Sequence, residues 1–448
     1  MQKTGNVNIN VHHLTRVEGH GNIVVNVKDG AIEKCEWQVP EAPRFFEAMV
    51  RGQHYSEVAR ITSRICGICA VAHTQVSVKA TEAALGMELS EQTILLRRIL
   101  KHAENFDSHM LHVFFLVAPD LLGAPSVFPL AATHGEVVKM ALRMKKVGCE
   151  WSSIIGGRST HPVKVVPGGF ASLPGEAFTV SQAEKELKNL KEMLLGLVPD
   201  VKTTQELLLE VASKIPSFTR ETEYVGLVDT EELGLYDGRI GCLMPDGKRE
   251  VFELDDYKSV TNEWVSPAST AKYTKHNMGS YMVGALARVN INFDMLHPEA
   301  RKIADSFGFK PICFNPYMNS VAQFIEAVHS VYQSIAYIDR LLEMGVKDEK
   351  PVEPQKFGRG VGAVEAPRGI LFHDYEYDEE GLCKGGNCII PTNQNHANIQ
   401  LDMEKLVPEL LDESKSEKDI ELALEMLVRG YDPCISCSTH YLDVKFKR

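Results

Sequence analysis

The sequence predicts a mainly helical α+β fold built around long packed helices. Apolar residues recur at helical spacing over several long stretches, and a turn sequence separates two short apolar runs near the N-terminus. Over the 448 residues, 44% are hydrophobic and 24% are charged, as in a globular protein with a large interior. These features favour an ordered protein over a disordered or fibrous one.

The first predicted element is a β-hairpin. Lys28-Asp29-Gly30 separates the apolar runs 23–27 and 31–39, and Asp-Gly is a common pair in hairpin turns. Residues 66–85 are then mostly compatible with a helix, and Gly86 is its candidate C-cap. Two cysteines and a histidine at the start of that helix would share one of its faces.

Capping residues and apolar periodicity predict the remaining elements. Ser90 is the candidate N-cap of a helix that runs to about Val117, and Ser-Gln-Ala-Glu at 181–184 reads as a capping box for a helix ending near Gly196. Further predicted elements are helices at about 204–214, 298–307, 319–344 and 416–429, and a small β-rich insertion at 236–257.

The strongest chemical signal is a pair of Cys-x-x-Cys motifs, each followed by a histidine. The residues are Cys66, Cys69 and His73 in the first motif, and Cys434, Cys437 and His440 in the second. Each motif brings two thiolates to one ion, so together they supply a four-sulfur shell for a soft or borderline metal. Because almost the whole chain separates the motifs, its two ends must meet in one core. We therefore expect a single domain over residues 1–440.

Two other interpretations of the cysteines stay open. Structural zinc uses the same ligands, although zinc ribbons usually hold their cysteine pairs about 15–20 residues apart. A thioredoxin-type redox motif needs one pair inside a βαβ unit and gives no reason for a second pair. Four other cysteines are expected to be small buried hydrophobic residues, namely Cys35, Cys149, Cys242 and Cys313.

Composition and charge argue against several classes of protein. The net charge of −12 disfavours a nucleic-acid partner, because phosphates are bound by basic surfaces. The most apolar stretch, 110–124, contains Asp120 and is too short to span a bilayer. No charged N-terminal region precedes an apolar one, and ten cysteines with metal-type pairs fit a reducing compartment. We therefore expect a cytoplasmic protein without a membrane span.

The residues around both cysteine pairs extend the signal. Arg64 begins R-x-C-G-x-C-x-x-x-H, and Asp432 begins D-P-C-x-x-C-x-x-H. Further signatures stand in order at 14–20, 43–47, 156–169 and 365–369. With them the chain resembles the large, catalytic subunit of nickel-iron hydrogenases, of the cytoplasmic bidirectional type. The resemblance implies that subunit's fold, a long central helix bundle with small peripheral β-sheets.

The activity that the resemblance implies is reversible cleavage of H2 into protons and electrons. Nickel would be held by all four cysteines, and Cys69 and Cys437 would also bridge to an iron that carries carbon monoxide and cyanide. Cys434 would be the first base, Glu18 would relay the proton, and the Arg368 guanidinium would stabilise charge beside the open coordination position. The simpler alternatives are an ion pair of Glu18 with Arg16 and a surface salt bridge of Arg368.

Residues farther from nickel are also implied by the resemblance. Glu47 and His440 would hold a magnesium ion, which prefers oxygen ligands. His73 and Asp432 would support the sulfur ligands from outside. Pro391 and Thr392 would line the pocket that receives an iron-bound cyanide, although a threonine is often only a turn residue.

The implied partners follow from the absence of iron–sulfur motifs beyond the nickel pairs. Electrons would leave through a small subunit with iron–sulfur clusters, and then through further subunits linked to NAD(P), a deazaflavin or a heterodisulfide reductase. A maturation protease would remove a C-terminal extension, here residues 441–448. A hydrogen-sensing regulatory subunit would keep the same metal site and stays an alternative. The homologous subunit of respiratory complex I lacks the cysteines and is disfavoured.

Overall fold

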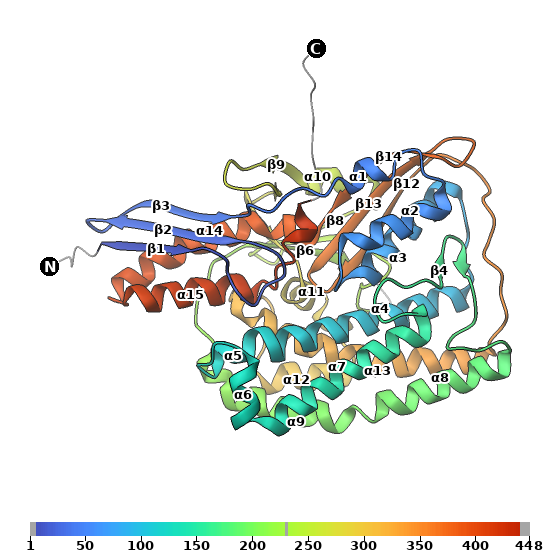
Figure 1. Cartoon of the computed structure of the whole chain (residues 1–448), viewed down its shortest axis with the longest axis horizontal. Coiled ribbons are helices and arrows are strands. Elements are labelled where there is room, and N and C mark those ends of the chain that lie inside the picture. Colours follow the sequence, from blue (N-terminus) through green and yellow to red (C-terminus); the bar gives the residue numbers. More distant parts are fainter. Residues whose placement is uncertain (1–5, 229–231, 440–448) are drawn as a thin grey trace, which may run out of the picture.

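Four long helices form the centre of the computed structural model, which describes residues 6–228 and 232–439. Helix α4 (Glu91–Leu111) packs against both α7 (Gly135–Gly156) and α13 (Asn319–Met344), and α8 (Val180–Leu195) lies along α13. This bundle occupies the lower half of the view in Figure 1. The predicted mainly helical α+β architecture is confirmed.

The other described helices surround this bundle and connect it to the sheets. None of the described helices is both long enough and apolar enough to cross a bilayer. The helices outside the central bundle are α1 (Phe46–Met49), α2 (Tyr55–Thr62), α3 (Ala70–Leu85), α5 (Ala118–Leu121), α6 (Val127–Thr133), α9 (Val198–Val211), α10 (Tyr257–Val260), α11 (Ala285–Ile291), α12 (Pro298–Ser306), α14 (Pro391–Asp412) and α15 (Glu417–Gly430).

The described strands form small sheets at the periphery. β1 (Val7–Val11), β2 (Asn22–Lys28) and β3 (Ala31–Gln38) make an antiparallel sheet that projects to one side over α14 and α15 (Figure 1). A second sheet has the order β11-β6-β7-β8, and two-stranded ribbons pair β4 with β5 and β9 with β10. The bounds of these strands are β4 (Val165–Val166), β5 (Gly169–Phe170), β6 (Glu223–Val228), β7 (Arg239–Leu243), β8 (Arg249–Phe252), β9 (Asn262–Val265), β10 (Lys272–Lys275) and β11 (Tyr281–Met282).

The sheet that positions the site consists of β12 (Arg359–Ala366), β13 (Gly369–Tyr377) and β14 (Cys383–Ile389). Helix α3 packs directly on β12. Glycines permit this close approach, because a Cβ at Gly360 or Gly362 would come within 2.2 Å or 2.6 Å of the backbone of α3. Ala366 pairs with Gly369 across the hairpin, so residues 367–368 form its tip.

Two local predictions were wrong in detail. The helix of the first cysteine motif begins only at Ala70, and Cys66 is extended (φ −133°, ψ 145°), so the two cysteines and His73 do not share a helix face. The capping box of α8 is formed by Thr179 and Gln182, two residues earlier than predicted. The N-terminal hairpin, the Ser90 N-cap and the helices at 298–306 and 319–344 are confirmed. Strand β1 was not predicted.

Candidate metal centre

The four motif cysteines meet in the interior, although they come from opposite ends of the chain. Their Sγ atoms all lie within 4.8 Å of one another, and those of Cys66 and Cys434 are 3.6 Å apart. Each of the four residues is at most 4% exposed. The predicted convergence of the two chain ends is therefore confirmed.

Local backbone structure aims the sulfurs inward. The segment that follows Cys66 turns back on it, so that the N–H groups of Ile68 and Cys69 donate to the Cys66 Sγ at 3.3 Å and 2.9 Å. In the second motif the N–H of Cys434 donates to the Thr392 Oγ1 at 3.0 Å. The two backbone N–H groups that donate to the Cys66 Sγ favour the ionised form of that sulfur.

The charges of the four thiols depend on one another. Burial by itself would raise the pKa of Cys66, but hydrogen bonds from the other three thiols lower it well below its usual value. Burial and the negative sulfurs nearby raise the pKa values of Cys434 and Cys437 well above the usual value. All four can be thiolates together only beside a cation. The donor set therefore fits a metal held by four sulfurs.

The Glu18 carboxylate lies against the second cysteine motif. The Glu18 Oε2 accepts the Ser436 N–H at 3.1 Å, and the Oε1 accepts the Ser436 hydroxyl. The backbone carbonyl of Glu18 accepts the Ile435 N–H at 2.9 Å. The side chain is half-buried. The alternative pairing with Arg16 is wrong, because Arg16 makes its ion pair with Asp120 at 2.5 Å.

Arg368, at the tip of the β12–β13 hairpin, is buried beside the cysteines. Its Nη2 donates to the Asp432 Oδ1 at 2.8 Å, and its Nη1 donates to the Ser108 Oγ at 3.3 Å. Burial acts to lower its pKa, but Asp432 and the sulfurs of Cys434 and Cys69 raise it well above the usual value. The guanidinium is only 3% exposed and stays charged, so a surface salt bridge is ruled out.

The structure brings most of the other predicted residues to the same region. Thr392 is buried at the start of α14, directly after Pro391. Asp432 also accepts from the Gln323 amide at 2.9 Å, and His73 lies in α3 with its ring 5.7 Å from that of His373.

Glu47 is half-buried, and its Oε1 accepts the Cys388 N–H at 2.8 Å. Its proposed magnesium partner His440 and the extension 441–448 lie outside the described residues.

A family model described as nickel-dependent hydrogenase matches residues 44–134 and 251–440, including all four cysteines. The chain belongs to this family. A second model, described as HoxL-like, matches residues 8–42. The resemblance to hydrogenases is therefore confirmed, and the chain is a hydrogenase.

Individual relatives agree with this assignment over nearly the full length. The chain is 31% identical to sulfhydrogenase 2 subunit alpha of Pyrococcus furiosus and 30% identical to sulfhydrogenase 1 subunit alpha of the same organism. These matches cover 97% and 96% of this chain and 99% and 97% of the relatives. A crystal structure of an NAD+-reducing nickel-iron hydrogenase in its H2-reduced state matches with a TM-score of 0.82 and 28% identity, covering 97% of this chain and 99% of the other. The hydrogenase large-subunit fold is therefore confirmed.

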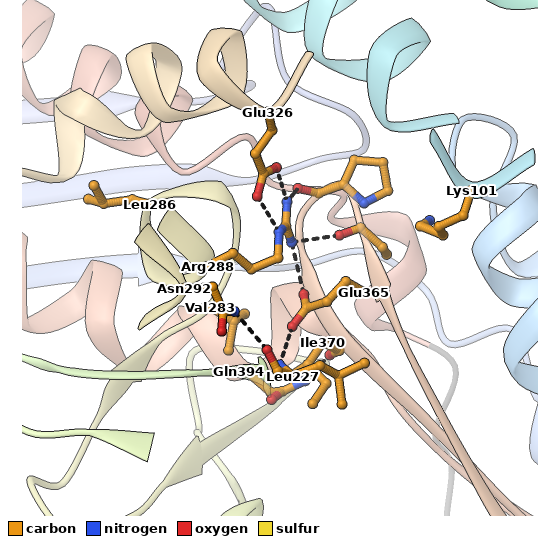
Figure 2. A network of polar contacts seen from close by, with 12 residues as sticks. Lys101, Leu227, Val283, Leu286, Arg288, Asn292, Glu326, Glu365, Ile370 and Gln394 are labelled. Carbon is orange, nitrogen blue, oxygen red and sulfur yellow. Dashed lines mark hydrogen bonds and ion pairs between the residues drawn. The ribbon is translucent and has the colours of Figure 1, made fainter. Parts of the chain in front are cut away.

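Sequence reasoning gave no role to the residue that holds the hairpin tip of this hydrogenase. Arg288 of α11 is fully buried between Glu326 and Glu365 (Figure 2). It donates two hydrogen bonds of 2.6 Å to Glu326 and one of 2.8 Å to Glu365. It also donates to the carbonyls of Ala366 and Pro367, both at 3.0 Å. Arg288 thus fixes the two peptides that precede Arg368.

The acidic groups around Arg288 respond to it differently. Despite burial, the guanidinium lowers the pKa of Glu326 to about 2. Burial raises the pKa of Glu365 to about 7, although Arg288 acts to lower it. His109 adds a contact of 2.9 Å between its Nε2 and the Glu326 Oε2. Ion pairs in this network link α13 through α11 to the β12–β13 hairpin.

Arg44 is a second residue whose role was missed, although it stands in a recognised signature. Its Nη2 donates to the carbonyl of Ile65 at 2.7 Å and to the carbonyl of Ser436, and its own N–H donates to the Thr439 carbonyl at 2.8 Å. Ile65 precedes Cys66, and Ser436 lies between Cys434 and Cys437. One side chain therefore joins both cysteine segments.

Proposed function

We propose that this chain is the catalytic subunit of a nickel-iron hydrogenase that cleaves H2 reversibly and heterolytically. The observation that carries the proposal is the buried cluster of four sulfurs in a chain of the nickel-dependent hydrogenase family. Cys66, Cys69, Cys434 and Cys437 would hold nickel, with Cys69 and Cys437 also bridging to an iron bearing cyanide and carbon monoxide. When bound, this centre supplies the Lewis acidity needed to split H2.

The protein's own groups would then accept and move the proton. In the proposal the Cys434 Sγ takes it first, and the carboxylate of Glu18 carries it away from the cysteines. The Ser436 hydroxyl donates to the Glu18 Oε1, which supports a relay along the second cysteine motif. Because Glu18 is half-buried, it can exchange the proton with groups nearer the surface.

The remaining polar groups would orient ligands and stabilise charge. Arg368 would place its fixed positive charge beside the sulfurs, oriented by Asp432 at 2.8 Å. Thr392 accepts the Cys434 N–H, so its own hydroxyl proton is available to donate to a cyanide in a pocket that Pro391 helps to line. His73 would support the sulfurs from α3.

A magnesium ion would be a separate support in this proposal. Glu47 would supply an oxygen ligand and His440 a nitrogen. Glu47 also accepts the backbone N–H of Cys388, which ties it to β14.

We further propose that electrons leave through a small subunit with iron–sulfur clusters, in a cytoplasmic complex. Additional subunits would pass them to NAD(P), a deazaflavin or a heterodisulfide reductase, and a maturation protease would trim residues 441–448. The names of the relatives support two parts of this proposal: an alpha subunit belongs to a complex of several subunits, and an NAD+-reducing hydrogenase passes electrons to NAD+.

Metal analysis combined with infrared spectroscopy of the purified protein tests the metal assignment. We expect about one nickel and one iron per chain, with bands of carbon monoxide and cyanide. Zinc held by the four cysteines with no such bands would overturn it. Hydrogen uptake by the purified complex with several electron acceptors separates an enzyme from a hydrogen sensor. Turnover is expected with at least one acceptor, whereas a loaded site without turnover would favour the sensor.

A further inference from the structure

A second cluster of metal-type side chains lies away from the four cysteines. Glu223, Cys242 and His276 each offer a ligand atom, and these three atoms lie within 4.8 Å of one another. Glu223 opens β6, Cys242 lies in β7, and His276 directly follows β10. Three segments that are separate in the sequence therefore bring an oxygen, a sulfur and a nitrogen to one point.

Sheet geometry explains the meeting of the first two residues. Val225 pairs with Cys242 in the antiparallel pair β6–β7, so Glu223, two residues before Val225, faces the same side of the sheet as Cys242. Glu250 pairs with Cys242 across β7–β8 and shares that side. The His276 Nδ1 lies 2.6 Å from the Glu223 Oε1.

Hydrogen bonds within the cluster join Glu223 to His276 and Cys242 but leave one carboxylate oxygen over. Glu223 is fully buried, and its Oε2 has no hydrogen-bond partner among the described residues. A buried carboxylate oxygen without a partner is costly, so native structures rarely leave one. Cys242 is only 1% exposed, and burial together with Glu223 and Glu250 raises the pKa of its thiol. A cation at this point would compensate both the carboxylate and an ionised sulfur.

We propose that Glu223, Cys242 and His276 bind one zinc ion. Cysteine sulfur, histidine nitrogen and carboxylate oxygen are the ligands that zinc takes in proteins, and mixed sets of this kind are usual for it. Three protein ligands leave a fourth position for water, because the Glu250 carboxylate already accepts from Lys248 and Asn277. The ion would fasten the segment after β10 to the β11-β6-β7-β8 sheet.

The present geometry needs only a small change to take the ion. Ligand atoms around a tetrahedral zinc lie about 3.4 Å apart, whereas the His276 Nδ1 and the Glu223 Oε1 are at hydrogen-bond distance. An outward shift of the 276 segment by under about 1 Å would suffice. The simpler alternative is a buried glutamate–histidine pair to which the Cys242 thiol is also hydrogen-bonded, and it still leaves the Glu223 Oε2 without a partner among the described residues.

Zinc uptake by the purified hydrogenase, with its native metal centre in place, tests the proposal. After dialysis against zinc, wild-type protein is expected to hold one zinc per chain in addition to its nickel and iron. Cys242→Ser should weaken zinc binding at least about tenfold, since it removes the sulfur ligand. Cys383→Ser, which removes a buried thiol from another sheet, should bind zinc as the wild type does. X-ray absorption at the zinc edge should show one sulfur at about 2.3 Å and lighter ligands at about 2.0 Å.

Several results would overturn the proposal. Two of them are a wild-type protein that takes up no zinc at micromolar concentration and a Cys242→Ser variant that binds zinc as tightly as the wild type. A zinc edge with four sulfurs would place the ion at the nickel cysteines instead. If Cys242→Ser does not fold, His276→Gln at the partly exposed ring gives the same comparison. The infrared bands of the nickel-iron centre are recorded on the same samples, so failure here is distinct from failure of the hydrogenase assignment.

Discussion

Replacing Arg288 with lysine would test how this hydrogenase holds Arg368 in place. Arg288 joins the carboxylates of Glu326 and Glu365 to the carbonyls of Ala366 and Pro367. Arg288→Lys keeps the positive charge, but a single ammonium cannot reproduce the fork of a guanidinium. It would reach Glu326 or the hairpin carbonyls, and not both.

The structure gives the expected magnitude. Arg288 donates hydrogen bonds to two carboxylates and two carbonyls, and lysine would lose at least two of them. Hydrogen bonds to charged groups contribute about 1.5–3 kcal/mol each, and a bond to a neutral carbonyl about 1 kcal/mol. The free energy of unfolding of the variant should therefore be about 3 kcal/mol lower than that of the wild type. A displacement of the Arg368 guanidinium by about 1 Å would lower kcat about 100-fold.

The assay is hydrogen uptake with an artificial acceptor, normalised to the nickel and iron content of each preparation. Arg220→Lys is the matched control, because Arg220 also contacts a buried carboxylate, Asp402, yet does not touch the hairpin. The control should lose stability and keep its kcat. Wild-type kcat in Arg288→Lys, at unchanged metal content, would refute the positioning role of Arg288.

Three further predictions concern proton transfer, metal retention and pH. Glu18→Gln should keep nickel and iron and lose at least about 100-fold in uptake, because an amide cannot relay a proton; uptake above a tenth of the wild type would contradict this. Arg44→Met should release nickel to a chelator about tenfold faster than the wild type, since it removes the hydrogen bonds that join the two cysteine segments. An unchanged release rate would argue against that role. Burial lowers the pKa of His396 to about 3 from 6.5, and its Nδ1 accepts the Trp37 Nε1–H at 3.0 Å. As the pH falls, this histidine therefore becomes protonated in the unfolded chain before it does in the folded one. The free energy of unfolding should drop by about 2 kcal/mol between pH 7 and pH 5 for this reason. Thermal unfolding of His396→Gln over this range should lack that loss, and a pH dependence equal to the wild type would contradict the assignment.

Sequence patterns predicted the features that depend on neighbours along the chain. The Ser90 cap, the helix at 319–344 and the hairpin around Asp29-Gly30 follow from residues a few positions apart. The two Cys-x-x-Cys motifs needed no structure to indicate a shared metal, because their ligand type and spacing are themselves chemical. Local pattern failed where tertiary packing decides, as at Cys66, which is extended and precedes α3.

The remaining parts of the site became visible only in three dimensions. Glu326 and Glu365 lie 38 and 77 residues from Arg288 in the chain, and no local periodicity marks such a partnership. The cluster of Glu223, Cys242 and His276 depends on the register of two strands and on where the segment after β10 lies. The sequence by itself determined the four-sulfur ligand set and most of the helices. Tertiary structure decided which buried charges face each other, because that depends on contacts between segments that folding alone brings together.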